Sequence, residues 1–555
     1  MNKTWWKESV VYQIYPRSFN DANNDGIGDL RGIIQKIDYI KSLGVDVIWL
    51  CPIYQSPNDD NGYDISDYTA IMTEFGTMAD FDELLDIVHR NGLKLILDLV
   101  LNHTSIEHPW FLQAKKSKDN PYRGYYHWRK GGNGHPPNNW PSFFKGSVWE
   151  FDESSNEYYL HLFSKKQPDL NWENPAVRQE IHDLMRFWLN KGIDGFRMDA
   201  IPLISKDTNF PDTRLQSFNQ IIDQVYANGP RVHEFIREIH DEVLSDYDVF
   251  TVGEGPGISP EVARLYTGMH RKELNTVFHF GHLFLGQGKN GKYDVVPWTL
   301  PEFKNIFAIW DKACADEGWN SIFLGNHDFS RMVSRFGNDG QFREQSAKLL
   351  AMLLLSMRGT VFLYQGDEIG MTNVAFHSID DYHDIETVNS FKEAAKAGAD
   401  LDQFLKIVHD QSRDNARTPM QWDRTKHSGF SAVAPWINCN PNYMEVNVTQ
   451  CEANPHSVLN FYRRMIKFRK EHKTLVYGQF NLLYKEDPDL FVYERFDENN
   501  KMLVVLNFSD KKRNLTLPHD GSTALKCLIS NYNREIDHKA DWLNLEPWEA
   551  NIYKI

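Results

Sequence analysis

Three carboxylate residues each end or directly follow a short apolar stretch that is typical of a buried strand. They are Asp199, Glu254 and Asp328. One acidic residue at the end of a strand indicates little. Several carboxylates brought to one place repel one another, so a fold gathers them only where a ligand or a reaction requires it. Two such groups could provide an attacking carboxylate and a carboxylic acid that donates a proton.

Arg197 lies two residues before Asp199 in the apolar stretch 195–200. Alternation along a strand places both side chains on the same face. A buried arginine and a buried aspartate are costly unless they contact each other or a ligand. Taken alone, the pair is best interpreted as a structural ion pair. The polar residues at other strand ends, including His103 and His327, favour a functional site instead.

Strand-like and helix-like stretches alternate along much of the chain, as in a parallel sheet with crossover helices. Helices are expected near 30–43, 79–91 and 175–189. The expected strands are 10–15, 45–51, 93–101, 195–200, 249–254, 276–280, 321–324 and 360–365. Eight such strands predict a closed (β/α)8 TIM barrel, whose active site lies at the C-terminal ends of the strands. That rim would bring Asp199, Glu254 and Asp328 together.

Two stretches interrupt this alternation. Residues 104–172, after strand three, are rich in Gly, Pro, Asn, Trp and Tyr, and they predict an inserted irregular subdomain B with a functional or a packing role. Short strand-like runs from about residue 476 predict a C-terminal all-β domain, a β-sandwich over 476–555. The catalytic barrel would then comprise 1–103 and 173–475.

A loop after the first strand carries oxygen-bearing side chains on alternate residues. Asp21, Asn23, Asp25 and Asp29 surround Gly26 in this loop. This pattern is typical of a site for a hard cation, Ca²⁺ or Mg²⁺. An EF-hand is not expected, because the flanks are a strand and a helix rather than two helices. The alternative is a turn rich in Asp and Asn that holds no metal.

Composition narrows the possible partners and the compartment. The formal net charge of −16 argues against binding to nucleic acid or to an anionic membrane. No signal peptide or membrane-spanning segment is expected, and five scattered cysteines suggest reduced thiols in a cytoplasmic protein. The 16 Trp, 24 Tyr and 34 Phe residues suit the apolar faces of sugars or a large aromatic core.

Four ordered motifs resemble those of the α-amylase superfamily of retaining α-glycoside enzymes, in its oligo-1,6-glucosidase and α-glucosidase branch. A fifth stretch, QPDLN at 167–171, resembles the motif that marks this branch. The four motifs are DLVLNH at 98–103, GFRMD at 195–199, GE at 253–254 and NHD at 326–328. The resemblance implies an exo-acting α-glucosidase that releases glucose from the non-reducing end of short α-glucosides. The implied partner is a small oligosaccharide, bound by a monomer or weak homodimer.

The resemblance also implies a role for each residue that matches a motif. Asp199 would be the nucleophile, Glu254 the general acid and then base, and Asp328 the stabiliser of the transition state. Arg413 is preferred to Arg417 for the sugar pocket. The implied substrate-binding residues are Asp60, Tyr63, His103, Phe163, Gln167, Arg197, Ala200, His327 and Arg413. The implied ligands of a structural Ca²⁺ are Asp21, Asn23, Asp25, Asp29 and the backbone of Ile27.

Electrostatics agree with these implied roles. Arg197 beside Asp199 should keep the nucleophile ionised. Two anionic neighbours, Asp199 and Asp328, should raise the pKa of Glu254 and suit it to donate a proton. A site dense in carboxylates would also stabilise a positively charged, oxocarbenium-like transition state.

Departures from the family pattern concern the leaving group. Ala200 stands where enzymes that favour α-1,6 bonds commonly have valine, so we expect α-1,4 or mixed specificity. Gly281 stands where this branch often has an acidic residue. The Gly-Pro-Gly run at 255–257, after the acid, is also unusual for the branch. A sucrose isomerase is an alternative, although residues 283–289 lack that group's arginine- and aspartate-rich loop. Trehalose-6-phosphate hydrolase is another alternative. Non-catalytic heavy chains of amino-acid transporters are disfavoured, because they lack the full set of carboxylates.

Overall fold

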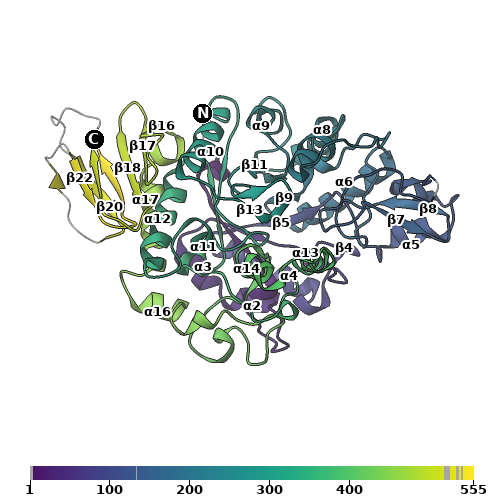
Figure 1. The fold of residues 1–555 in the computed structure, drawn as a ribbon, viewed down its shortest axis with the longest axis horizontal. Helices are drawn as coiled ribbons and strands as arrows, with labels where there is room; N and C mark the ends of the chain where they lie inside the picture. Colours follow the sequence, from purple (N-terminus) through teal and green to yellow (C-terminus); the bar gives the residue numbers. More distant parts are fainter. Residues whose placement is uncertain (1–3, 133, 518–524, 533–536, 539–541) are drawn as a thin grey trace.

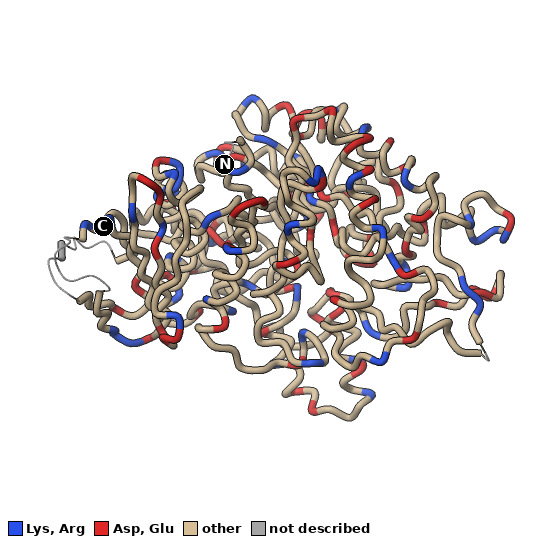
Figure 2. The backbone as a smooth tube through the Cα atoms, turned by 90° about the horizontal axis from the view of Figure 1, so that it is seen from above, with Lys and Arg blue, Asp and Glu red and all other residues tan. Residues whose placement is uncertain are grey.

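The computed structural model describes residues 4–132, 134–517, 525–532, 537–538 and 542–555. Figure 1 shows a central barrel, with the insertion that carries β7 and β8 at one end of the molecule and the C-terminal strands at the other. Lys and Arg are interspersed with Asp and Glu along the whole backbone (Figure 2). Within the described ranges, no helix has the length and apolar character needed to cross a membrane.

A closed parallel sheet forms the centre of the molecule. Its strands follow the order β11-β10-β9-β5-β2-β1-β15-β14. A parallel bridge between Val277 and Asn320 joins the two outermost strands, so the sheet closes into the predicted (β/α)8 barrel. The strands are β1 (Val10–Ile14), β2 (Val47–Leu50), β5 (Lys94–Val100), β9 (Gly195–Asp199), β10 (Phe250–Gly255), β11 (Thr276–His279), β14 (Ser321–Ile322) and β15 (Thr360–Tyr364).

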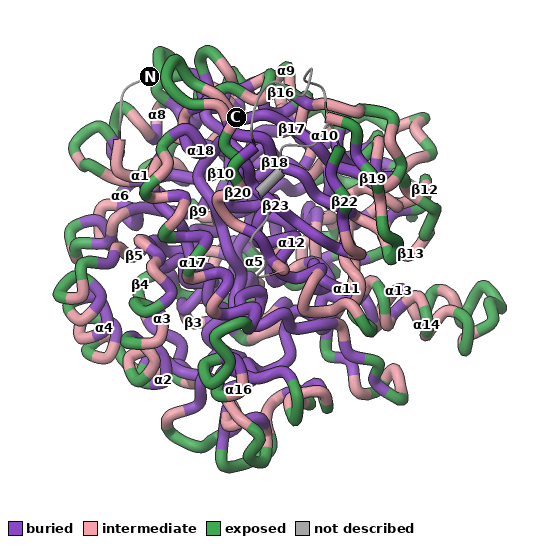
Figure 3. Tube along the Cα trace, turned by 90° about the vertical axis from the view of Figure 1, so that its left-hand side faces the viewer, coloured by how far each residue is buried: buried purple, intermediate pink, exposed green. Residues whose placement is uncertain are grey.

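Helices surround the barrel, and Figure 3 shows exposed residues alternating with buried ones along α2 and α4. In α4 (Met78–Arg90) a capping box between Thr77 and Asp80 starts the helix. Its buried residues Phe81, Leu84, Leu85 and Val88 recur at the spacing of one helix face. The other long barrel helices are α6 (Pro175–Lys191), α8 (Val232–Glu242), α10 (Leu300–Ala313) and α12 (Arg343–Ser356).

The helix predicted over 30–43 is divided in two. The structure has α2 (Leu30–Gln35) and α3 (Ile37–Leu43), because Lys36 adopts φ −106° and ψ 9°, outside the α-helical region. The side chain of Asp29 caps the start of α2 by accepting a hydrogen bond from the Gly32 amide. The apolar pattern runs across both helices and therefore did not reveal the break.

The insertion after β5 is less irregular than its composition suggests. It contains α5 (Pro109–Lys116) and a three-stranded antiparallel sheet of β6 (Trp128–Arg129), β8 (Glu157–Leu160) and β7 (Trp149–Asp152). A β-bridge between His103 and Asp169 attaches its far end to the barrel rim. Lys206 Nζ lies 3.0 Å from Asp169 Oδ2 and donates to Asn102 Oδ1 at 2.9 Å. This buried cation therefore links the insertion to the segments after β5 and β9.

The C-terminal strands form a sandwich. The larger, antiparallel sheet contains β16 (Gln479–Leu483), β17 (Leu490–Phe496), β18 (Lys501–Asn507), β23 (Ala550–Lys554), β20 (Leu525–Ser530) and β21 (Asp537–His538). The smaller pairs β19 (Arg513–Thr516) with β22 (Trp542–Leu545). Val492 and Leu503 from one sheet share a buried cluster with Leu515 and Leu543 from the other. No disulfide joins the five cysteines, all of which lie in the described part of the chain.

Candidate active site

Arg197 connects the carboxylates at the C-terminal ends of three neighbouring strands. Its guanidinium is fully buried, and its Nη1 lies 2.7 Å from Asp98 Oδ1 and 2.6 Å from Asp199 Oδ1. Its Nη2 lies 2.7 Å from Glu254 Oε1. The parallel register pairs Arg197 with Asp98 on β5 and with Val252 on β10, which brings the three acids around one cation. The sequence predicted an Arg197–Asp199 pair, whereas the arginine is shared.

Asp328 reaches the same cavity from the loop after β14. Its Oδ2 lies 3.0 Å from His327 Nε2, and its Oδ1 lies 2.9 Å from Arg417 Nη2 and 3.2 Å from Arg413 Nη1. Asn326 holds the turn, because its side chain accepts a hydrogen bond from the Asp328 amide at 2.8 Å. Asp328 therefore has cationic partners of its own and does not share Arg197.

The three carboxyl groups differ in proton affinity. Burial raises the pKa of Glu254 to about 8, and the charges of Asp199 and Asp328 add to this increase while Arg197 opposes it. Burial raises the pKa of Asp199 to about 7, again against Arg197. Burial would also raise the pKa of Asp328, but His327, Arg413 and Arg417 hold it well below its usual range. Glu254 is thus the group most readily protonated, and Asp328 is ionised.

Burial raises the pKa of Glu254 more than the neighbouring charges do. From the sequence we expected the charges alone to raise it. The charges of Asp199 and Asp328 act in the expected direction. The depth of the barrel rim, which the sequence did not reveal, therefore contributes most to the proton affinity of the acid.

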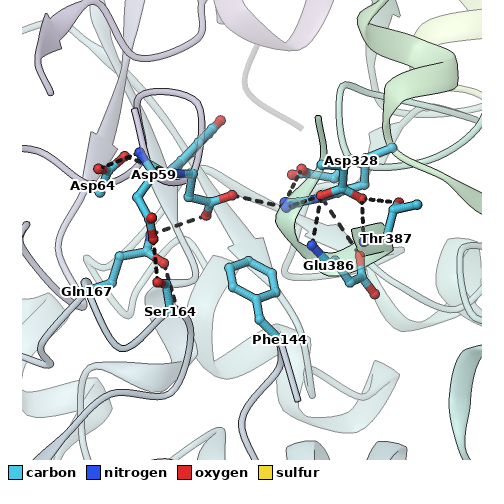
Figure 4. Close-up of polar contacts among 12 residues, drawn as sticks. Asp59, Asp64, Phe144, Ser164, Gln167, Asp328, Glu386 and Thr387 are labelled. Carbon is cyan, nitrogen blue, oxygen red and sulfur yellow. Dashed lines mark hydrogen bonds and ion pairs between the residues drawn. The ribbon is translucent and has the colours of Figure 1, made fainter. Parts of the chain in front are cut away.

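A network of hydrogen-bonding side chains closes one end of the cavity (Figure 4). Arg413 Nη2 lies 3.0 Å from Asp60 Oδ1, and Gln167 donates to Asp60 Oδ2 at 3.2 Å. Gln167 Nε2 lies 3.1 Å from His103 Nε2. Tyr63 Oη is 2.6 Å from His327 Nε2. Burial lowers the pKa of both histidines to about 4, so each is a neutral hydrogen-bonding group at neutral pH.

Aromatic rings cover this polar end. Phe163 packs 5.1 Å from the His103 ring, and Phe144 lies 5.0 Å from the Arg413 guanidinium. Figure 4 shows Phe144 between the group of Asp59, Ser164 and Gln167 and the group of Asp328 and Glu386. Six of the nine residues predicted for substrate line the cavity, namely Asp60, Tyr63, His103, Phe163, Ala200 and Arg413. Gln167, Arg197 and His327 lie behind this lining and contact it.

Ala200 adopts an unusual backbone conformation beside the acid. Its φ is 41°, in the left-handed region that few residues other than glycine occupy. Its amide donates a hydrogen bond to Glu254 Oε2 at 3.1 Å. The backbone of Ala200 therefore orients Glu254. This role is separate from the one in specificity that the sequence suggested for the Ala200 side chain.

Several residues of the cavity were not predicted from the sequence. Asp384 accepts from Arg413 Nε at 2.8 Å, and Glu386 Oε2 lies 3.2 Å from Lys292 Nζ. Asp384 and Glu386 lie at the start of α13 (Ile385–Lys396), after the last barrel strand. They occur in a stretch with many acidic residues, so nothing in their spacing distinguished them. Arg417 was ranked below Arg413; both contact Asp328, but only Arg413 also lines the cavity.

The predicted metal loop is ordered by its own hydrogen bonds. Asp21 accepts from the amides of Asn24 and Gly26 at 2.7 and 2.8 Å, and Asp25 accepts from Ile27 at 2.8 Å. Among the residues that the structure describes, no group of three or more His, Cys, Asp or Glu is arranged to hold a metal ion. Carboxylate oxygens have a second lone pair, so the donor set still fits a hard cation. Calcium stays a prediction.

A family model described as "Alpha amylase, catalytic domain" matches residues 13–478. A second, "Maltogenic Amylase, C-terminal domain", matches residues 480–552. The boundary between these matches falls just before β16, where the C-terminal sandwich begins.

Full-length relatives have several enzyme names. The chain is 54% identical to an oligo-1,6-glucosidase of Parageobacillus thermoglucosidasius, with 100% of both chains covered. It is 44% identical to a trehalose-6-phosphate hydrolase of Bacillus subtilis strain 168, covering 99% of this chain and 98% of the relative. A crystal structure of isomaltulose synthase from Klebsiella sp. LX3 has a TM-score of 0.97 and 44% identity, with both chains fully covered.

Proposed function

Because this chain belongs to the α-amylase family of glycoside hydrolases, we propose that it is an exo-acting retaining α-glucosidase. It would release glucose from the non-reducing end of short α-glucosides, of the maltose and isomaltose type and also sucrose. One observation carries this proposal: Asp199 and Glu254 both contact the guanidinium of Arg197. Arg197 Nη1 lies 2.6 Å from Asp199 Oδ1, and Nη2 lies 2.7 Å from Glu254 Oε1. A retaining mechanism requires two carboxyl groups in such proximity.

In the first step, an oxygen of Asp199 attacks the anomeric carbon, and the bond from that carbon to the leaving oxygen breaks. Glu254 donates its proton to the leaving oxygen, and a glucosyl ester of Asp199 results. The ionised Asp328 stabilises the positive charge that develops on the sugar ring. Burial raises the pKa of Glu254 to about 8, and the charges of Asp199 and Asp328 add to this increase, so Glu254 is suited to hold the proton that it donates.

In the second step, Glu254 is ionised and takes a proton from a water molecule. The water oxygen attacks the anomeric carbon, the ester bond breaks, and Asp199 is regenerated as a carboxylate. Two inversions at this carbon leave the α configuration unchanged. The proton taken from water replaces the one that Glu254 gave to the leaving group in the first step.

The closed end of the cavity supports an exo mode of action. Asp60, Arg413 and Gln167 are joined by hydrogen bonds across that end, and each has polar atoms suited to a sugar hydroxyl. A chain that continued beyond one glucose unit would meet this network. We therefore place the terminal glucose there and the leaving group on the other side of Glu254.

Two related activities are weaker candidates. The cavity is lined by five acidic side chains (Asp60, Asp199, Glu254, Asp328 and Glu386) and three cationic ones (Lys145, Lys292 and Arg413). This balance disfavours a phosphorylated substrate such as trehalose 6-phosphate. Sucrose isomerisation is favoured only by the similarity to isomaltulose synthase. From Ala200, we propose α-1,4 or mixed linkage preference over strict α-1,6 preference.

The test compares catalytic variants on maltose, isomaltose, sucrose and trehalose 6-phosphate. Asp199→Ala and Glu254→Gln should each lower kcat/KM for disaccharides by about 10³-fold or more. Asp183→Asn, a similar change at a side chain that is 62% exposed on α6, should have no effect. NMR should show that glucose is first released as the α anomer. Near-normal turnover by Asp199→Ala, or initial release of β-glucose, would refute the mechanism.

We further propose a structural Ca²⁺ at Asp21, Asn23, Asp25, Asp29 and the carbonyl of Ile27. The oxygen-rich composition of the loop supports this assignment. A cytoplasmic location is supported by the five cysteines, none of which forms a disulfide. A monomer or weak homodimer is expected, and analytical ultracentrifugation across a concentration series tests that expectation.

A further inference from the structure

The imidazole ring of His327 lies between two tyrosine rings. The ring centroids of Tyr15 and Tyr63 are 5.9 and 5.2 Å away, at interplanar angles of 20° and 6°. The His327 side chain is fully buried. Stacking fixes the plane of the ring, but it does not determine which nitrogen carries the proton, because the two tautomers have nearly the same shape. The hydrogen bonds at Nδ1 and Nε2 therefore determine the tautomer.

Two oxygen atoms that accept hydrogen bonds face Nε2 of His327. Asp328 Oδ2 lies at 3.0 Å and Tyr63 Oη at 2.6 Å. Asp328 is ionised, because its neighbours hold its pKa well below the usual range, and a carboxylate can only accept. Tyr63 donates its own hydroxyl hydrogen to Asp98 Oδ2 at 2.9 Å, so its oxygen accepts as well. Nε2 must therefore carry a hydrogen and act as the donor.

Gln13 on β1 faces the other nitrogen of His327. Its Nε2 lies 2.8 Å from His327 Nδ1, and the same nitrogen donates to Cys51 Sγ at 3.2 Å. A side-chain amide has two N–H donors, so one is available for each partner. With a hydrogen on Nε2 of the imidazole, Nδ1 has a free lone pair that accepts from Gln13. A second proton on Nδ1 would point at this donor, so Gln13 opposes formation of an imidazolium.

The charged groups near His327 act on it in opposite directions. Burial is the largest cause of its low pKa, about 4; Arg197 and Arg417 act in the same direction, and Asp328 opposes them. Burial also raises the pKa of the neighbouring thiol and phenols, which are therefore uncharged at neutral pH: Cys51, Tyr15 and Tyr63. Gln13 adds a local effect at Nδ1 to these charges.

We propose that Gln13 is a positioning residue that keeps His327 neutral, with its single proton on Nε2. Nε2 then donates to Asp328, whose negative charge stabilises the transition state in the mechanism proposed above. An imidazolium at this position would cancel part of that charge. Gln13 is buried behind the residues that line the cavity, so it acts through His327 and not on the substrate. This inference rests on the proposed function, because it assigns a residue to the same site.

The first test reads the protons directly. NMR of protein labelled with ¹⁵N at histidine distinguishes the two ring nitrogens, and the His327 signals are those that disappear in His327→Asn. In the wild type, Nε2 should carry the proton, and neither nitrogen should titrate between about pH 5 and pH 9, because burial lowers the pKa of His327 to about 4. A proton on Nδ1 of the wild-type protein would overturn the inference.

The second test replaces the donor with a carboxylate of nearly the same shape. In Gln13→Glu, the introduced carboxylate and His327 should share one additional proton that titrates between about pH 5 and pH 9. Once this proton leaves, the introduced carboxylate and Asp328 compete for the remaining imidazole proton. Relative to the wild type, kcat/KM should therefore fall by about tenfold or more as pH rises. Unchanged His327 signals, or a ratio that is the same at every pH, would refute the role of Gln13.

Gln365 provides the matched control. It follows β15 directly and is fully buried, and its amide donates to the carbonyl of Gln13 at 3.0 Å. Its side chain accepts from the Tyr15 amide at 2.8 Å and donates to the Ser18 carbonyl at 3.3 Å. Gln365→Glu should leave the His327 signals without titration and the kcat/KM ratio independent of pH. The same titration in this control would show that any buried carboxylate nearby has the effect, which would overturn the assignment to Gln13.

The outcomes separate the two proposals. If the wild-type protein hydrolyses no α-glucoside, the proposed function fails, and the NMR titrations of the wild type and Gln13→Glu still determine whether Gln13 controls the protons of His327. If the wild type is active but His327 does not titrate in Gln13→Glu, only the role of Gln13 fails.

Discussion

Arg197 lies between carboxyl groups that must hold different protonation states at the same time. It contacts Asp98, Asp199 and Glu254, so its charge alone does not select which acid ionises first. The Ala200 amide contacts only Glu254, and burial acts on all three. Asp199 and Glu254 are equally buried, so the difference between acid and nucleophile arises from the remaining neighbours of each group.

The pH dependence of kcat/KM should be bell-shaped. Glu254 acts in its protonated form, so activity is lost as pH rises through about 8. Asp199 acts in its ionised form, so activity is lost as pH falls through about 7. The two acids share Arg197 and titrate as a pair. The apparent pKa of each limb of the pH profile therefore belongs to the pair and not to one residue. Initial rates on maltose between acidic and alkaline pH measure both limbs.

A variant assigns the alkaline limb to one residue. Glu254→Gln should lose this limb when it is assayed with nitrophenyl α-glucoside and azide. This leaving group needs no proton and azide needs no base, so neither step requires Glu254. If the variant loses activity at the same alkaline pH as the wild type, another group controls that limb.

The strand-end residues of the site could be predicted from the strand pattern, whereas its loop residues were predicted only where the family resemblance implied them, as for Asp60 and Arg413. Asp199, Glu254 and Asp328 end or follow apolar stretches, and parallel strands bring such ends to one rim. Asp384, Glu386 and Lys292 come from segments that fold back over the cavity after β11 and β15. Their positions depend on tertiary packing, which has no periodic signal in the sequence.

At the scale of elements, the cavity is enclosed by segments outside the barrel strands. Asn389 of α13 donates a hydrogen bond to the carbonyl of Phe144 in the insertion at 3.1 Å. Tyr293 in β13 (Gly291–Val295) stacks 5.7 Å from Phe404 in α14 (Leu401–Gln411). The eight strands were predicted correctly because they have continuous apolar runs. The α13–α14 pair was not predicted, since it has few buried residues.

Lys206 should contribute strongly to stability through the insertion. Its side chain is 2% exposed and pairs with the fully buried Asp169. Lys206→Met would leave this carboxylate without its charged partner, which costs about 3–5 kcal/mol of unfolding free energy. Lys396→Met makes the same change at an ion pair whose lysine is 73% exposed, and should cost about 1 kcal/mol or less. Urea unfolding followed by circular dichroism compares the two. Equal losses would refute the structural role of Lys206.

The Asp21–Asp29 loop should respond to calcium if the metal prediction is correct. At a calcium concentration of about 100 times Kd, binding adds about 2.7 kcal/mol to the unfolding free energy. Chelation with EDTA should therefore lower Tm, and added Ca²⁺ should restore it. Asp25→Ala removes one proposed ligand and should abolish the calcium-dependent shift. If Tm is the same with EDTA and with Ca²⁺, the loop is the metal-free turn that its hydrogen bonds already describe.

At the scale of the whole molecule, the C-terminal sandwich is attached to the barrel by buried side chains. Lys304 on α10 donates to the carbonyls of Tyr484, Asp487 and Leu490 at 2.8, 2.8 and 3.0 Å. The α12 helix is buried from Ser346 to Ser356 and packs against β18 and β23 of this sheet. The sequence predicted both domains. It did not predict their attachment, since a single lysine in a helix is usually a surface residue.

Arg495 on β17 should control the stability of both domains together. It is fully buried and donates to the carbonyls of Ser356, Leu475, Thr474 and Gly478, which end α12 and form the turn before β16. Arg495→Met keeps much of the apolar stem but removes this donor from the carbonyls of Ser356 and Gly478, at about 1–3 kcal/mol each where no water replaces it. The carbonyls of Leu475 and Thr474 still accept from Arg469 and from the Gly478 amide.

These acceptors lie outside the sandwich, so Arg495 links the sandwich to the barrel. We expect Arg495→Met to lower Tm while the barrel and the sandwich still unfold in one transition. Calorimetry and the thermal loss of glucosidase activity should report the same midpoint. Arg424→Met, at an arginine that is exposed, is the matched control and should leave Tm within a few degrees of the wild type. Two separate transitions in Arg495→Met, with activity following only the later one, would show that the sandwich does not support the barrel.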